Sequence, residues 1–199
     1  MTSGEHSGVV DARARTVLDR LREEDQAQRD AGLSVAERTR NATAPTGAFL
    51  YTIARVAGAR RIFEMGSSNG YSTIWLALAA RENGGRVDGV EILPERAAAA
   101  SRHLAEAGLA DVARVCQGDA AAAAAGMSDL DLVFIDAEKD DYARLFLAVV
   151  DRVRPGGLIL TDNVVSHDCA AFQQVARARR DILTQTLPFE RGIELSLKR

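Results

Sequence analysis

Two carboxylates and one amide follow short apolar runs in the second half of the chain. Asp136 comes directly after Leu132–Ile135, and Asp162 and Asn163 come directly after Gly157–Thr161. If both runs are neighbouring parallel strands, the three side chains leave adjacent strand ends and point into one crevice. Such an all-oxygen set suits a hard divalent cation, Mg²⁺ first, with Ca²⁺ or Mn²⁺ as alternatives, and does not suit zinc. The alternative is that they cap helices or line a pocket without a metal.

A glycine-containing segment follows an earlier apolar run, Arg61–Met65. Gly66 and Gly70 have the spacing G-x-x-x-G, which allows a tight turn into a helix and a close approach of the backbone to a ligand. Dinucleotide sites have G-x-G-x-x-G instead, and the adjacent Glu64 would repel a pyrophosphate. Glu64 could attract a cationic ligand such as S-adenosylmethionine, through its amino group or its sulfonium. A plain strand-to-helix turn is the alternative.

Further acidic positions fit the nucleoside part of such a ligand. Glu91 ends the next apolar run 21 residues after Gly70 (91 minus 70). This is close to the ~20-residue offset at which an acidic residue accepts hydrogen bonds from ribose hydroxyls. Asp119 and Ala120 follow the third run and could contact the adenine ring, although Asp119 could equally cap a helix.

A lysine and a histidine lie near the acidic set in the sequence. Lys139 follows Asp136 by three residues, and a lysine beside a cation and a sulfonium could have a lowered pKa and act as general base. His167 follows Asn163 by four residues and could contact a substrate or relay a proton. Both could instead be ordinary solvated side chains. The catalytic hypothesis names Lys139 and Asp136, and the substrate hypothesis names His167 and Lys139.

The elements that must hold these residues alternate between strand and helix. From Arg61 onward each apolar run is followed by a helical pattern, which predicts a parallel sheet with helices on both faces. The tail reads as two strands, ILTQTLPF and GIELSLKR, whose brief connection requires an antiparallel pair. Two helices precede the sheet, one from Val9 to about Asp30 and one from just after Pro45 to near Gly58.

The predicted fold is therefore α/β. It is a Rossmann-like, doubly wound, mostly parallel seven-stranded sheet with an antiparallel C-terminal strand pair and N-terminal helices. We expect one domain over residues 1–199, with a helical segment at 1–58 and the Rossmann-like core at 59–199.

Net charge, apolar run length and cysteine spacing limit the kinds of binding partner that we expect. The 199 residues carry a net charge of -3, which gives no broad attraction for nucleic acid or anionic membranes. No apolar run approaches the ~20 residues that cross a bilayer, and the N-terminus does not resemble a signal peptide. Cys116 and Cys169 match no metal or redox spacing and are expected to be free thiols. We expect a cytoplasmic protein with a small-molecule partner and neither nucleic acid nor membrane.

Several segments together form a specific pattern: Pro45–Leu50, Phe63–Ser72, Val90–Glu91, Gly118–Ala120, Val133–Lys139, Arg154–Leu158 and Asp162–Val165. Through these segments, most of the chain resembles the caffeoyl-CoA and catechol type of class I S-adenosylmethionine-dependent O-methyltransferases.

The resemblance implies roles for individual residues. It implies Lys139 as the base, a metal held by Asp136, Asp162 and Asn163, and a homodimer. The implied S-adenosylmethionine contacts, to which we add Asp119 and Asp136, are Glu64, Gly66, Ser67, Ser72, Glu91, Ala120 and Glu138. The chain departs from plant members at His167, where they have an asparagine after a tryptophan, and at Ala42, where they have a cofactor-contacting threonine. These departures leave the acceptor open.

The sequence thus predicts metal-dependent methyl transfer from S-adenosylmethionine to a hydroxyl of a small catechol-like acceptor. One alternative is a metal-independent O- or N-methyltransferase for another small molecule. A second is a nicotinamide-dependent oxidoreductase, against which the glycine spacing and the terminal strand pair argue. A third is a binding module without catalysis.

Overall fold

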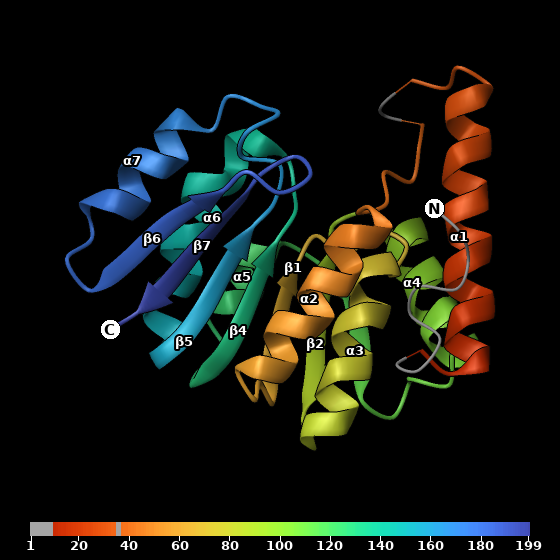
Figure 1. The fold of residues 1–199 in the computed structure, drawn as a ribbon, viewed down its shortest axis with the longest axis horizontal. Coiled ribbons are helices and arrows are strands. Elements are labelled where there is room, and N and C mark those ends of the chain that lie inside the picture. Colours follow the sequence, from red (N-terminus) through yellow and green to blue (C-terminus); the bar gives the residue numbers. More distant parts are fainter. Residues whose placement is uncertain (1–9, 35–36) are drawn as a thin grey trace.

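The structure is a computed structural model that describes residues 10–34 and 37–199. The described residues form seven α-helices, two short 3₁₀ helices and one seven-stranded sheet (Figure 1). The helices are α1 (Ala12–Asp30), α2 (Ala44–Val56), α3 (Tyr71–Asn83), α4 (Pro94–Glu106), α5 (Ala120–Ala124), η1 (Lys139–Asp141), α6 (Tyr142–Val149), η2 (Val150–Arg152) and α7 (Ala170–Ala178). The strands are β1 (Arg61–Met65), β2 (Arg86–Glu91), β3 (Ala113–Gln117), β4 (Leu130–Ile135), β5 (Val153–Thr161), β6 (Ile182–Leu187) and β7 (Ile193–Lys198).

The strand order confirms the predicted Rossmann-like plan. The sheet runs β3-β2-β1-β4-β5-β7-β6, and the pairs among β3, β2, β1, β4 and β5 are all parallel. Strand β7 lies between β5 and β6 and runs antiparallel to both, so the predicted hairpin is present and its second strand inserts beside β5. The strand order reverses between β1 and β4. In open α/β sheets ligands bind at the carboxyl ends beside such a reversal.

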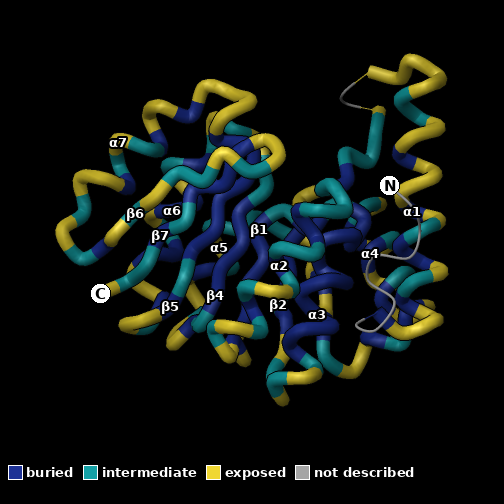
Figure 2. Tube along the Cα trace, in the orientation of Figure 1, coloured by how far each residue is buried: buried dark blue, intermediate teal, exposed yellow. Residues whose placement is uncertain are grey.

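Two hydrophobic layers cover the sheet. Alternate residues of a strand face opposite sides, so Ile62 and Phe134 pack with α1 to α4 while Phe63 and Ile135 pack with α5 to α7. Figure 2 shows the central strands β1 and β4 as dark blue, buried tubes between these layers. The loops at the carboxyl ends of the strands are therefore anchored on a closely packed core.

Several helix boundaries differ from the sequence expectation. Val9, the expected start of the first helix, lies outside the described residues. Helix α1 begins after Asp11, whose side chain accepts from the Ala14 amide at 2.9 Å. Helix α2 begins at Ala44, so Pro45 lies in its first turn rather than before it. The helix expected from Asp140 is a 3₁₀ turn followed by α6, and the helix expected near Asp168 begins at Ala170.

Two further expectations concern membrane-spanning helices and the state of the two cysteines. None of the described helices combines the length and apolarity needed to span a membrane. Both cysteines are free thiols, as predicted, with Cys116 exposed and Cys169 buried.

Candidate active site

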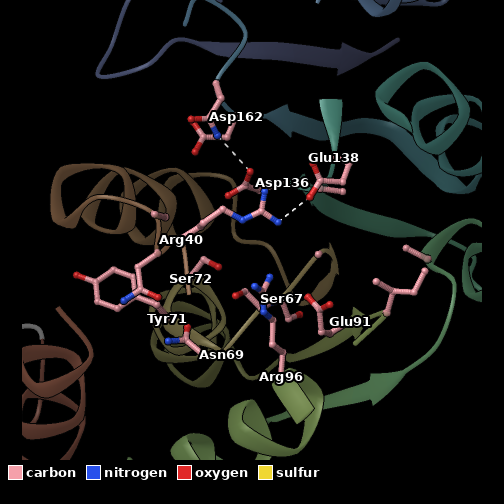
Figure 3. Close-up of a pocket in the computed structure, with 18 of the residues that line it drawn as sticks. Arg40, Ser67, Asn69, Tyr71, Ser72, Glu91, Arg96, Asp136, Glu138 and Asp162 are labelled. Atoms are coloured by element: carbon pink, nitrogen blue, oxygen red, sulfur yellow. Dashed lines mark hydrogen bonds and ion pairs between the residues drawn. The ribbon is translucent and has the colours of Figure 1, made fainter. Parts of the chain in front are cut away.

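A cavity of about 530 Å³ opens at the carboxyl ends of the parallel strands. This volume lies in the usual range for small-molecule sites. Its walls come from the loops after β1, β2, β3, β4 and β5, from the segment between α1 and α2 and from the β6–β7 turn, and Figure 3 shows several of these side chains pointing into it. The predicted site residues that line it are Gly66, Ser67, Ser72, Glu91, Asp119, Ala120, Asp136, Glu138, Lys139, Asp162, Asn163 and His167.

The glycine loop after β1 is hydrogen-bonded to the end of β2 and lies against the backbone that follows β4. The amides of Gly66 and Ser67 both donate to the Val90 carbonyl, at 2.9 and 3.1 Å. Gly66 has a φ of +96°, and a Cβ at this position would lie 2.2 Å from the Asp136 carbonyl oxygen. Only glycine fits here, because any side chain would collide with the backbone that follows β4.

Glu64 is fully buried behind this loop and is the predicted cofactor residue that does not line the cavity. Its Oε2 accepts from the hydroxyl of Ser67 at 2.6 Å and from that of Thr73. Burial raises the pKa of Glu64, and hydrogen bonds from Ser67, Ser72 and Thr73 oppose that rise. Glu64 therefore supports the loop from behind, and its predicted direct contact with the cofactor stays a prediction.

Glu91 and Asp119 lie at the ends of the next two strands. Glu91 accepts from the amides of Ser68 at 2.8 Å and Leu93 at 2.9 Å, one on each carboxylate oxygen. These bonds hold the carboxylate in a fixed position on the cavity wall, where it could receive ribose hydroxyls. Asp119 Oδ1 accepts from the Ala122 amide at 2.8 Å and so caps α5. The alternative prediction, that Asp119 caps a helix, is therefore confirmed, although the residue also lines the cavity.

The predicted set of two carboxylates and an amide does come together. Figure 3 labels its two carboxylates, Asp136 and Asp162. The amide of Asp136 donates to the Met65 carbonyl and that of Asp162 donates to the Ile135 carbonyl, each at 3.0 Å. These hydrogen bonds extend the parallel pairing by one residue beyond the ends of β4 and β5. They bring Asn163 Nδ2 within 3.1 Å of Asp136 Oδ1.

Asp162 is the least satisfied member of the set. Its side chain is buried, and its Oδ1 has no hydrogen-bond partner among the described residues. Burial, followed by the negative charge of Asp136, raises the pKa of Asp162 to about 7. A buried, unpartnered carboxylate oxygen beside a second carboxylate fits a bound cation. Within the described residues no three His, Cys, Asp or Glu side chains gather as a metal group, so a third protein ligand would be the amide of Asn163.

Lys139 is held against the same set by three hydrogen bonds. Its Nζ donates to Asp136 Oδ1 at 3.0 Å, to the Ala137 carbonyl at 3.0 Å and to the Tyr142 hydroxyl at 2.6 Å. The Tyr142 hydroxyl in turn donates to the backbone carbonyl of Asp162 at 3.0 Å. Burial first, and then the charges of Asp136 and Asp162, raise the pKa of Tyr142 well above its ordinary value. Sequence reasoning missed Tyr142, although its three-residue offset from Lys139 was a usable signal.

The segment between α1 and α2 crosses the cavity, which the sequence did not predict. Arg40 reaches Glu138 at 2.6 Å, and this hydrogen bond lowers the pKa of Glu138 (Figure 3). The Ser68 hydroxyl donates to the Thr39 carbonyl at 2.7 Å, which fixes the segment over the glycine loop. Glu138, predicted to contact the cofactor, therefore points to Arg40 in this structure.

His167 lines the cavity at its exposed side. Its Nδ1 lies 2.9 Å from the hydroxyl of Ser166. A contact between His167 and the substrate stays a prediction.

Comparison with known proteins decides the family. The family model of O-methyltransferases matches residues 7–193. The chain belongs to the S-adenosylmethionine-dependent O-methyltransferase family. This O-methyltransferase is 36% identical over 157 residues to the catechol O-methyltransferase of Niastella koreensis, covering 75% of this chain and 71% of the relative. It is 39% identical over 126 residues to the catechol O-methyltransferase of Mycobacterium tuberculosis, covering 62% and 56%.

Solved structures agree with this family. The O-methyltransferase TomG from Streptomyces achromogenes, which is involved in tomaymycin synthesis and was solved in complex with S-adenosylmethionine, matches with a TM-score of 0.79 and 29% identity. The match covers 97% of this chain and 93% of TomG. The predicted class of enzyme is thus confirmed, and the nicotinamide-dependent alternative is set aside.

Proposed function

We propose that this O-methyltransferase methylates one hydroxyl of a catechol-like acceptor, with a divalent cation held by Asp136, Asp162 and Asn163. The observation that carries the proposal is the buried Asp162 Oδ1 without a partner, next to a second carboxylate and an amide. The names of the two catechol O-methyltransferase relatives support a vicinal diol as acceptor.

Two groups of residues at the carboxyl edge of the sheet would have separate roles, one in binding the methyl donor and one in binding the cation. The backbone around Gly66 and the carboxylate of Glu91 would bind the methyl donor, with Glu91 receiving the ribose hydroxyls. Asp136, Asp162 and Asn163 would bind Mg²⁺. When bound, that cation supplies Lewis acidity, which orients both oxygens of a vicinal diol and lowers the pKa of one hydroxyl.

Lys139 is the proposed proton acceptor. A lysine accepts a proton only in its uncharged form, so Nζ must also give up one of the three hydrogen bonds that it donates in this structure. Lys139 would first take the acceptor's proton. The resulting oxyanion would then attack the methyl carbon of the sulfonium, so that the C–O bond forms as the C–S bond breaks. Because charge is neutralised in this step, a dry cavity accelerates it.

One observation favours a metal-independent transfer instead. Lys139 lies 3.0 Å from Asp136 and already compensates the charge of that carboxylate. In this second candidate Asp136 and Lys139 would orient and deprotonate the acceptor without a cation.

The deciding experiment is methyl transfer from labelled S-adenosylmethionine to catechol, with Mg²⁺ and with EDTA. We expect turnover that EDTA abolishes and that Mg²⁺ restores. Asp162→Ala should remove this turnover and leave the Kd for S-adenosylhomocysteine nearly unchanged, while the exposed control Asp168→Ala should behave as wild type. Turnover that persists in EDTA favours the second candidate, and cofactor binding without turnover on any acceptor favours the binding module.

Two expectations from the sequence accompany this proposal. We propose a homodimer, which sedimentation can test, and a cytoplasmic location, which cell fractionation can test.

A further inference from the structure

We infer that the acceptor carries a carboxylate on its aromatic ring and that Arg191 binds this carboxylate. The inference rests on the proposed function and deepens it, because it names a chemical class within the catechol-like acceptors. It also makes Arg191 a specificity-determining residue.

Arg191 is held in position by the loop that carries the proposed metal ligands. It lies in the turn between β6 and β7 and lines the cavity together with Asp162 and His167. Its carbonyl accepts from the amides of Val165 and Ser166, both at 3.0 Å. The backbone of Arg191 is therefore tied to the segment that follows β5.

The next residue keeps the two segments in close contact. Gly192 has a φ of +90°, and a Cβ there would lie 2.3 Å from the Val165 side chain. Its carbonyl accepts from the Val164 amide at 3.1 Å. The backbone from which the Arg191 side chain extends is consequently fixed against the loop that follows Asp162.

Three of the other arginines that line the cavity have acidic partners. Arg29 pairs with Asp25 at 2.8 Å, Arg40 with Glu138 at 2.6 Å, and Arg144 with Asp119 and Asp141, each at 3.0 Å. The side chain of Arg191 is exposed and makes no hydrogen bond or ion pair with any described residue. Its guanidinium is available for a ligand at the side of the cavity where Asp162 lies.

The chemistry of the free group points to a carboxylate. A guanidinium presents a planar pair of donors that matches the two oxygens of a carboxylate. During the proposed reaction the cavity would also contain a sulfonium and a divalent cation, so its positive charge would exceed that of Asp136 and Asp162. An anionic acceptor would gain Coulomb attraction there, whereas a cationic acceptor would be repelled.

The test compares two acceptors that differ in charge and hardly in shape, 3,4-dihydroxybenzoate and 3,4-dihydroxybenzamide. We expect wild type to prefer the acid by ~10-fold or more in kcat/KM, the size of a charge-assisted hydrogen bond. Arg191→Gln should bring this ratio close to one, chiefly through KM, and Arg191→Glu should invert it. Because the ratio is taken within each variant, a general loss of activity cancels.

Controls separate the role of Arg191 from net charge. Arg180→Gln removes the same charge from an exposed position outside the cavity and should keep the wild-type ratio. Arg191→Lys keeps the charge without the planar donor pair and should give an intermediate ratio. Calorimetric Kd values for both acceptors, with S-adenosylhomocysteine and Mg²⁺ present, measure the same preference without turnover.

The proposed function and the proposed role of Arg191 can be tested separately. If neither acceptor is methylated, the proposed function fails, and the Kd values still decide the role of Arg191. Equal kcat/KM and equal Kd values for the acid and the amide in wild type would overturn the inference. A preference for the acid that survives in Arg191→Gln would overturn it as well.

Discussion

The ammonium of Lys139 lies 2.6 Å from the hydroxyl of Tyr142, which itself donates to the backbone carbonyl of Asp162 at 3.0 Å. One buried hydroxyl therefore connects the proposed base to the strand end that carries a proposed metal ligand. Lys139 Nζ also lies 4.8 Å from the centre of the Tyr142 ring. The 3₁₀ turn before α6 makes this possible, because it places both side chains on the same side of the chain.

Tyr142 is thus a positioning residue for Lys139. Tyr142→Phe removes the acceptor for Nζ and leaves the Asp162 carbonyl without its donor. We expect kcat to fall about 10-fold or more, with the pH profile of kcat displaced because Nζ loses a partner, and stability to fall by about 1–3 kcal/mol. Tyr51→Phe is the matched control, since Tyr51 binds Glu82 away from the cavity. A normal kcat and pH profile with only reduced stability would make Tyr142 merely structural.

Asp162 should make the metal-free protein less stable as pH rises. Its pKa of about 7 in the folded chain exceeds the ordinary value of 3.8, so the folded state binds more protons between these values. Stability from this group is complete below pH ~4 and is lost as pH rises through about 7. In EDTA we expect the free energy of unfolding to fall by on the order of 2–3 kcal/mol from pH 5 to pH 8.

Urea unfolding with matched variants checks this expectation. Asp162→Asn should lack this pH-dependent loss, and Asp168→Asn should keep it. At pH 8, Mg²⁺ should stabilise wild type and not Asp162→Asn, because the substitution removes one of the two carboxylates proposed to bind the cation. The same pH dependence in wild type and Asp162→Asn would contradict the raised pKa.

Glu91 should determine affinity for the methyl donor. Glu91→Gln removes the charge and presents an amide donor to one of the two backbone amides that the carboxylate now accepts from. We expect the calorimetric Kd for S-adenosylhomocysteine to rise about 10-fold or more. Glu95→Gln, in the exposed first turn of α4, should leave the Kd unchanged. Equal affinities for wild type and Glu91→Gln would remove Glu91 from the cofactor site.

Gly66 should tolerate no side chain. Gly66→Ala would combine an unfavourable positive φ with a collision against the Asp136 carbonyl, and we expect a loss of roughly 2–5 kcal/mol in stability together with weaker cofactor binding. Gly84→Ala separates the two effects, because Gly84 has a φ of +67° and nothing within 4 Å of the added Cβ. That variant should lose only about 1–2 kcal/mol. Similar losses in both variants would show that the collision is relieved by a small shift.

The sequence by itself determined the sheet and the edge at which the site lies. Each apolar run identified a buried strand, and parallel strands place their carboxyl ends at one edge. Asp136, Asp162, Asn163 and Glu91 directly follow or end such runs, so their convergence could be inferred from position alone. The short connection between the last two strands likewise required them to be antiparallel.

Only the tertiary structure decided which side chains meet at that edge. Arg40 and Glu138 are 98 residues apart and pair across the cavity, and Arg191 reaches the site because β7 inserts beside β5. Glu64 has the sequence position of a cofactor residue yet is buried behind the glycine loop. Periodicity in a sequence reports which face of an element is buried, because burial of apolar side chains drives folding. Contacts between distant polar side chains depend instead on how the elements pack, which no local pattern encodes.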